Sequence, residues 1–208
     1  MRMLREMTKT PFYVLLHPFQ GFWDLKYENK GRLRVALSML LLLTVATILL
    51  RQYAGFVVNF NYPYDLNSIN ELQYIVLPFF LWCVANWSLT TLMDGEGKFK
   101  DIVMATGYAL LPLILMRFGN VLISNIITTR ESAFYYMIDS LSVLWFVWLL
   151  FIGTMTVHQY TVLKTIVTMV LTLVVMGIIM FLGLLFFSLL QEMIGFVVSI
   201  YNEISYRI

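Results

Sequence analysis

Residues 166–190 read IVTMVLTLVVMGIIMFLGLLFFSLL and contain no charged residue in 25 positions. An α-helix needs about 20 apolar residues to cross roughly 30 Å of hydrocarbon, so this stretch predicts a membrane span. Four earlier stretches have the same character and predict spans at 35–58, 74–93, 102–126 and 141–157. The fold class predicted from these blocks is all-α, a polytopic membrane protein with a five-helix bundle.

The overall composition agrees with a membrane location. Of the 208 residues, 60% are hydrophobic and 12% charged, which inverts the proportions of a soluble domain. Many Trp and Tyr residues, Trp23, Tyr53 and Tyr74 among them, stand near block ends, as in an interfacial belt. Cys83 is the only cysteine, so neither an intramolecular disulfide nor a cysteine-based metal site is expected.

The distribution of Lys and Arg predicts how the chain is oriented. Seven precede the first span, two lie between the second and third, and one follows the fourth, which gives ten on one side. The opposite side has two, Arg130 and Arg207. Because cytoplasmic loops are enriched in basic residues, we expect a cytoplasmic amino terminus and an external carboxyl terminus.

Amphipathic segments flank the spans, within a single domain that covers 1–208. Residues 1–34 form a predicted cytoplasmic arm, in which Phe19, Phe22 and Trp23 have helical spacing after Pro18. This helix either lies on the inner membrane surface or docks on the protein's own loops. Residues 191–208 predict an outer amphipathic helix that lies flat or continues the fifth span, and it is a candidate face for a partner.

No arrangement typical of an enzyme is present. His17 and His158 do not belong to an H-E-x-x-H pair, and neither a G-x-S-x-G motif nor a Walker-type phosphate loop occurs. We therefore predict no catalytic, cofactor or metal site, and no nucleic-acid partner.

Two polar loops are predicted to face the cytoplasm, 94–101 and 158–160. They supply a candidate functional cluster of Asp94, Glu96, Lys98 and His158. Such a cluster could bind a divalent cation or a lipid headgroup, since oxygen ligands suit hard cations. The simpler interpretation is a tight glycine turn whose polar side chains hydrogen-bond across the loops to fix helix ends.

Arg117 is the most unusual residue within the spans. A charged side chain in hydrocarbon is penalised by a few kcal/mol unless it snorkels or pairs. Asn120 shares its face in the outer half of the third span, and Asp139 or Glu71 could approach it. Snorkelling or internal pairing is the simpler interpretation, and an outward-facing anion site is the alternative. Arg51, near the outer end of the first span, is explained by snorkelling.

The stretch DGEGKF at 94–99, followed by GYALLP at 107–112, resembles the central signature of the Yip family, the Ypt/Rab-interacting membrane proteins. In that family a short glycine-containing loop joins the second and third of five spans, and a G-Y-x-x-x-P run lies in the third. Gly107, Tyr108 and Pro112 occupy those positions here. HPFQGF at 17–22, NW at 86–87 and HQY at 158–160 are similar to the bacterial branch.

The resemblance covers nearly the whole chain and implies a five-helix fold without catalytic activity, in a bacterial cytoplasmic membrane. The eukaryotic D-L-Y-G-P motif is absent, so a role with Rab GTPases does not transfer. Bacterial relatives are often encoded beside carbohydrate ABC transporters, which implies a scaffold or accessory subunit that binds such a permease, or self-association. The alternatives are a transporter, channel or lipid-translocating protein that uses the polar residues of the third span, and, more distantly, an intramembrane hydrolase.

Overall fold

The computed structural model describes residues 2–59 and 67–207. It is 85% helical, with no strand in the described part of the chain, which confirms the predicted all-α class. The helices are α1 (Arg2–Leu16), α2 (Pro18–Lys26), α3 (Leu33–Tyr53), α4 (Ser68–Leu92), α5 (Phe99–Ala109), α6 (Leu111–Ile123), the short η2 (Thr129–Glu131), α7 (Ser132–His158) and α8 (Val162–Arg207).

Five helical segments are long and apolar enough to cross a membrane, as predicted: α3, α4, α5 with α6, α7, and α8. The fourth begins earlier than predicted, because α7 starts at Ser132 and not at Leu141. Polar residues made this first part resemble a loop. Their hydroxyls are satisfied by the backbone, however, since Ser132 donates to the carbonyl of Thr129 at 2.9 Å and Ser140 donates to that of Tyr136 at 2.8 Å.

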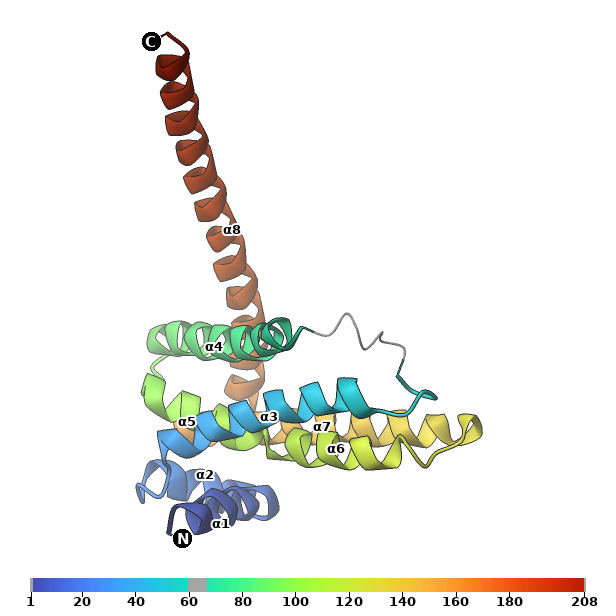
Figure 1. The fold of residues 1–208 in the computed structure, drawn as a ribbon. Helices are drawn as coiled ribbons and strands as arrows, with labels where there is room; N and C mark the ends of the chain where they lie inside the picture. The colour runs from blue at the N-terminus through green and yellow to red at the C-terminus, as the bar shows by residue number, and fades with distance from the viewer. Residues whose placement is uncertain (1, 60–66, 208) are drawn as a thin grey trace.

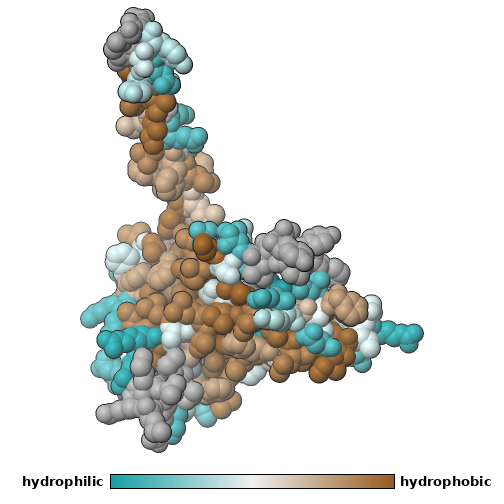
Figure 2. Space-filling model, in the orientation of Figure 1, coloured by the Kyte–Doolittle hydropathy of each residue, from teal (hydrophilic) through white to brown (hydrophobic). Residues whose placement is uncertain are grey.

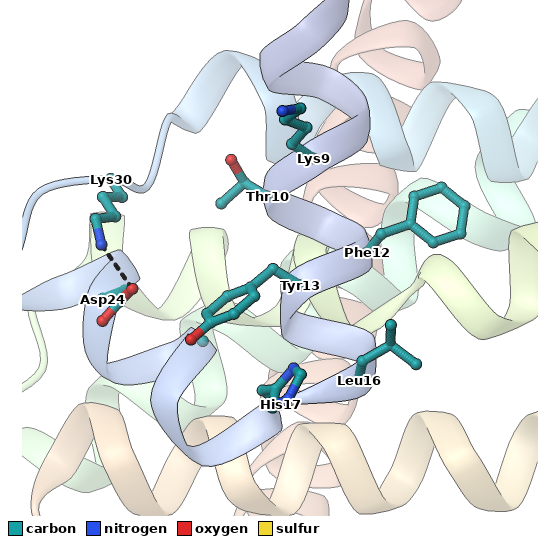
Figure 3. Close-up of a pocket in the computed structure, with 9 residues that line it drawn as sticks. Lys9, Thr10, Phe12, Tyr13, Leu16, His17, Asp24 and Lys30 are labelled. Atoms are coloured by element: carbon teal, nitrogen blue, oxygen red, sulfur yellow. Dashed lines mark hydrogen bonds and ion pairs between the residues drawn. The ribbon is translucent and has the colours of Figure 1, made fainter.

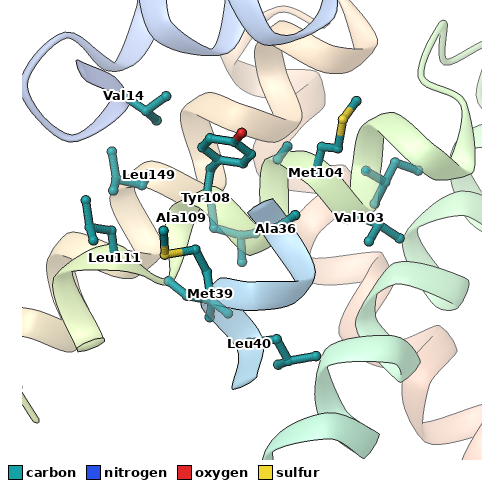
Figure 4. Packing of buried hydrophobic residues seen from close by; sticks show 14 of the residues in the cluster. Val14, Ala36, Met39, Leu40, Val103, Met104, Tyr108, Ala109, Leu111 and Leu149 are labelled. Atoms are coloured by element: carbon teal, nitrogen blue, oxygen red, sulfur yellow. The ribbon is translucent and has the colours of Figure 1, made fainter. Parts of the chain in front are cut away.

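The third span is the centre of the bundle and is broken at Leu110. Pro112 stands in the first turn of α6, and because a proline nitrogen cannot donate a hydrogen bond, the helix stops and restarts. In the most apolar window of this span 67% of the residues are buried, the highest share among the five spans. Figure 4 shows Tyr108 packed near Ala36 of α3 and Leu149 of α7.

The amino-terminal arm is a pair of helices, which the sequence did not predict. We expected one helix from Pro18 on, whereas α1 precedes it and contains Pro11. The two helices turn at His17 and lie against each other, with Val14 of α1 fully buried at Gly21 of α2. Figure 1 shows this hairpin on one side of the bundle and α4 with α8 on the other.

The hairpin packs along α7 rather than apart from the bundle. Phe22 is fully buried and lies close to Gly153, and the Lys26 ammonium donates to the carbonyl of Val157 at 2.7 Å. Near the turn, Pro18 and Trp145 line a hollow of about 370 Å³. Because Trp145 lies 13 residues before the end of α7, the turn reaches roughly 20 Å along that helix from the loop end.

The fifth span and the predicted outer helix form one continuous α-helix of 46 residues, α8. This resolves the alternative between a tail lying flat and a tail continuing the span in favour of the second. Only the beginning of α8 packs firmly, through Thr165, Thr168 and Thr172, which are fully buried. The helix then leaves the bundle (Figure 1), and its surface is apolar along most of its length (Figure 2).

Candidate functional site

The loop after α4 meets the end of α7 at one end of the bundle, and His158 is the centre of this contact. Its side chain is buried. The backbone N–H of Gly97 donates to Nδ1 of His158 at 3.4 Å, so the ring proton lies on Nε2 and is donated to Asn86 Oδ1 at 3.2 Å. Asn86 Nδ2 then donates to the Thr172 hydroxyl at 3.4 Å. This relay joins the loop to α7, α4 and α8.

The two glycines of the loop are explained by the closeness of His158. A Cβ at Gly95 would lie 2.5 Å from Nδ1 of His158, and one at Gly97 would lie 2.7 Å from its Cε1. Neither glycine has a positive φ; Asp94 takes the left-handed conformation instead, with φ 55°. The glycines therefore leave room for the imidazole, and the turn itself is made at Asp94.

Tyr160 closes the same junction. Its ring stacks on His158 with centroids 5.3 Å apart, and its hydroxyl donates to the carbonyl of Met93 at 3.0 Å. The Lys164 ammonium lies 4.1 Å from the ring centroid, within range of a cation–π contact. Burial raises the pKa of the Tyr160 hydroxyl, and the nearby Asp94 raises it further. The phenol therefore stays a neutral donor at physiological pH.

The arm reaches this end of the bundle as well. The Tyr27 hydroxyl donates to Glu96 Oε2 at 3.2 Å, and the Lys26 ammonium lies 3.6 Å from the same oxygen. Glu96 thus faces the arm and not His158. These contacts gather the arm, the 94–101 loop and the 158–160 loop at one end, the arrangement expected for segments on one membrane side.

The predicted cluster of Asp94, Glu96, Lys98 and His158 is therefore spread over several contacts. Lys98 precedes α5, where its backbone N–H donates to Asp101 at 3.2 Å and caps the helix. In the described part of the chain, no three His, Cys, Asp or Glu residues gather as a metal site would require. The geometry favours hydrogen bonds that fix helix ends over cation binding.

The G-Y-x-x-x-P positions have structural roles in the third span. A Cβ at Gly107 would lie 2.6 Å from Cβ of Ala36, so the glycine permits close approach of α5 to α3. Tyr108 is buried, and its hydroxyl accepts from the backbone N–H of Arg32 at 3.4 Å. Pro112 begins α6. The motif thus shapes and anchors the central span.

Charged residues at the other end of the bundle pair differently from our expectation. Glu71 does not approach Arg117; its carboxylate accepts from the Arg51 guanidinium at 2.5 Å. Arg51 is therefore in an ion pair, whereas snorkelling alone was expected. Asp139 accepts from Asn120 Nδ2 at 3.2 Å, and Arg117 is half-buried without an ion pair or hydrogen bond to the described residues. Neither of the two partners considered for Arg117, Asp139 and Glu71, forms an ion pair with it.

Sequence reasoning missed the polar residues that connect the spans. Asn86 was noticed only as part of a family motif, yet it holds His158 and reaches Thr172. Thr165, Thr168 and Thr172 are spaced three and four residues apart, and this spacing marks one helical face. That pattern was the available signal that α8 docks on α4.

The family described as the Yip1 domain matches residues 12–185, which is most of the chain. The match extends from the last turns of α1 into α8 and includes α2, the loop at Gly95 and the central span. Among curated proteins and solved structures, none matches the chain significantly. The chain belongs to the Yip1 domain family, a non-enzymatic family of membrane proteins.

Proposed function

We propose that this protein is a non-enzymatic membrane scaffold or accessory subunit that binds another integral membrane protein through α8. The observation that carries the proposal is the exposure of this helix. Its most apolar window has a mean hydropathy of 2.8, yet only 6% of it is buried, compared with 33% to 67% in the other four spans. The most hydrophobic span is the one least covered by its own bundle.

The length of α8 supports the same proposal. Forty-six helical residues extend over roughly 70 Å, more than twice the hydrocarbon thickness of a bilayer. The start is fixed to α4 by buried threonines, whereas Phe181 and Phe187 beyond it are exposed. A helix anchored at one end and free along its length offers a lateral surface to a second membrane protein. The family match ends at residue 185, before the last part of α8.

The partner proposed first is a permease of a carbohydrate ABC transporter, in a bacterial cytoplasmic membrane with the amino terminus inside. This identification rests on the resemblance to the bacterial branch of the family. Self-association through α8 is the alternative form of the same binding role.

Site-specific photo-crosslinking in native membranes tests the proposal. A photoreactive residue is placed at Phe181 or Phe187 on α8, and at Leu122 on α6 as a control that is 72% exposed. We expect protein adducts from the two α8 positions and not from Leu122, with the partner identified by mass spectrometry. An adduct of twice the chain mass indicates self-association. Adducts to lipid alone at all three positions would exclude the role of α8.

A second candidate function is a transporter, channel or lipid-translocating protein. Two observations favour it. Arg117 is half-buried and forms no ion pair with the described residues. Three residues later, the buried Oδ1 of Asn120 has no hydrogen-bond partner among the described residues. Both groups have unused hydrogen-bonding capacity in an apolar span. Reconstitution in liposomes tests it: flux above empty vesicles that is lost in Arg117→Gln supports transport, and the absence of flux removes this candidate.

A further inference from the structure

We propose that the groove between α1, α2 and the start of α3 binds the phosphate of an anionic phospholipid headgroup. A cavity of about 590 Å³ lies along the hairpin, and the residues lining it include Lys9, Tyr13, His17 and Lys30. A second cavity of about 320 Å³ shares Thr10 and Lys30 with it and continues to the start of α3. Together they form one groove that the functions proposed above do not use.

Basic residues lie at one end of the groove, and exposed apolar side chains border its outer edge. Lys9, Phe12 and Leu16 are spaced three and four residues apart, so they follow one another along one side of α1. All three line the larger cavity, and Phe12 and Leu16 are exposed. Figure 3 shows Thr10, Tyr13 and His17 on the side of α1 that faces Asp24 and Lys30, whereas Phe12 and Leu16 project from the other side of the helix and border the cavity at its outer edge. A phospholipid has the same order of groups, with its phosphate beside its acyl chains.

The charges of the groove favour an anion. Lys9 makes no hydrogen bond or ion pair with the described residues, so its ammonium is available to a ligand. Asp24 is the carboxylate in the lining, and the Lys30 ammonium lies 2.8 Å from its Oδ2 while it also pairs with Glu28, so Lys30 is already engaged and Lys9 is the cation left for a ligand. Arg32 adds a guanidinium in the second cavity. Each basic residue near a lipid surface contributes about 1 kcal/mol of attraction to anionic lipid.

The position of the hairpin suits a lipid ligand. Lys26 and Tyr27 hold it at the loop end of α7, whereas its turn lies beside Trp145, roughly 20 Å further along that helix. Lys9 and Lys30 are therefore near the level of the loops, and Leu16 is near the turn. A phosphate at Lys9 would place acyl chains along Phe12 and Leu16, parallel to the spans. A soluble phosphate would contact only the basic end of this groove, near Lys9.

Native mass spectrometry of the full chain in detergent tests the proposal, with phosphatidylglycerol, phosphatidylcholine and inorganic phosphate as separate probes. We expect phosphatidylglycerol to bind more tightly than phosphatidylcholine. Lys9→Ala should weaken phosphatidylglycerol binding about fivefold, because one basic contact is lost. Lys100→Ala, which removes another exposed lysine at the same end of the bundle, should leave it unchanged.

A second variant separates the two sources of phosphate. Phe12→Ser removes apolar wall without changing charge, so it should weaken phospholipid binding while the preference for phosphatidylglycerol remains. Equal binding of the two lipids, or equal effects of Lys9→Ala and Lys100→Ala, would overturn the proposal. Inorganic phosphate that binds as tightly as phosphatidylglycerol, with the same dependence on Lys9, would assign the groove to a soluble anion instead.

Discussion

The backbone N–H of Gly97 donates to Nδ1 of His158 over 3.4 Å, and this contact joins the loop after α4 to the end of α7. The imidazole fills the space in which a side chain at position 97 would otherwise lie. Because His158 also holds Asn86 of α4, its position determines how three segments meet.

Gly97→Ala should destabilise the bundle. The added Cβ would lie 2.6 Å from Cγ1 of Val157, which forces the loop away from α7. Overpacking of this kind costs typically 1–3 kcal/mol, and we expect a corresponding fall in the melting temperature in detergent. Gly119→Ala is the matched control, because nothing lies within 4 Å of a Cβ there and alanine favours a helix. Equal melting temperatures for the two variants would contradict the proposed role of Gly97.

Gly21→Ala should separate the two helices of the arm. A Cβ at residue 21 would lie 2.7 Å from Cα of Val14, a backbone atom that cannot move without displacing α1. We expect faster amide hydrogen exchange in α1 and unchanged exchange in α4. Gly195→Ala on α8 has open space around it and should change neither. Unchanged exchange in α1 would mean that the hairpin tolerates a wider separation.

The sequence predicts the spans well because hydrocarbon requires long apolar segments and permits few charges. It also predicts that the 94–101 and 158–160 loops face the same side of the membrane, since alternate loops share a side. It does not predict which atoms meet there. The ligands of His158 are a backbone N–H and the amide of Asn86, whereas we expected carboxylates, because charge is visible in a sequence and backbone geometry is not.

The arm and α8 show a second limit. The sequence predicts one helix after Pro18, whereas α1 precedes that proline and contains Pro11. Helical periodicity alone does not distinguish a surface helix from one that packs on a neighbouring span, because both have one apolar side. For α8, the apolar sequence indicates a membrane span. It does not indicate what share of the helix surface is buried against the other helices of the bundle.

Removing Arg51 and removing Glu71 from their ion pair should lower the stability of the protein by different amounts. The Glu71 side chain is only 4% exposed and that of Arg51 is 45% exposed. Arg51→Gln leaves a buried carboxylate without its cation and should cost about 2 kcal/mol. Glu71→Gln leaves a cation that reaches solvent and should cost under about 1 kcal/mol.

The double variant provides the control for this pair. Because it leaves no buried charge, Arg51→Gln with Glu71→Gln should be more stable than Arg51→Gln alone. Urea or thermal unfolding in detergent measures all three variants. Additive losses would show that the two residues do not interact.

Acid should loosen the arm through Asp24. The Lys30 ammonium, hydrogen-bonded to this carboxylate, holds the pKa of Asp24 below its ordinary value, although burial opposes the shift. A lowered folded pKa contributes stability above the unfolded pKa of about 3.9, and this contribution is lost as the pH falls through the folded value. Fluorescence of Trp23 should therefore report a less stable arm at pH 3 than at pH 6. Lys30→Met should make the stability of the arm depend less on pH. An equally steep pH dependence in the variant would mean that other carboxylates cause the loss of stability in acid.

The orientation of the protein in the membrane can be tested at the carboxyl terminus, whose predicted side depends both on the charge distribution and on whether α8 crosses the membrane. Ten basic residues against two predict a cytoplasmic amino terminus, and five spans then require an external carboxyl terminus. This holds only if α8, which leaves the bundle, crosses the membrane. An alkaline phosphatase fusion after Ile208 should be active, and one after Gly95 inactive, because the enzyme needs the oxidising exterior. Inactivity at both positions would mean that α8 stays on the cytoplasmic side, so that its exposed apolar length would be available to a partner there and not within the bilayer.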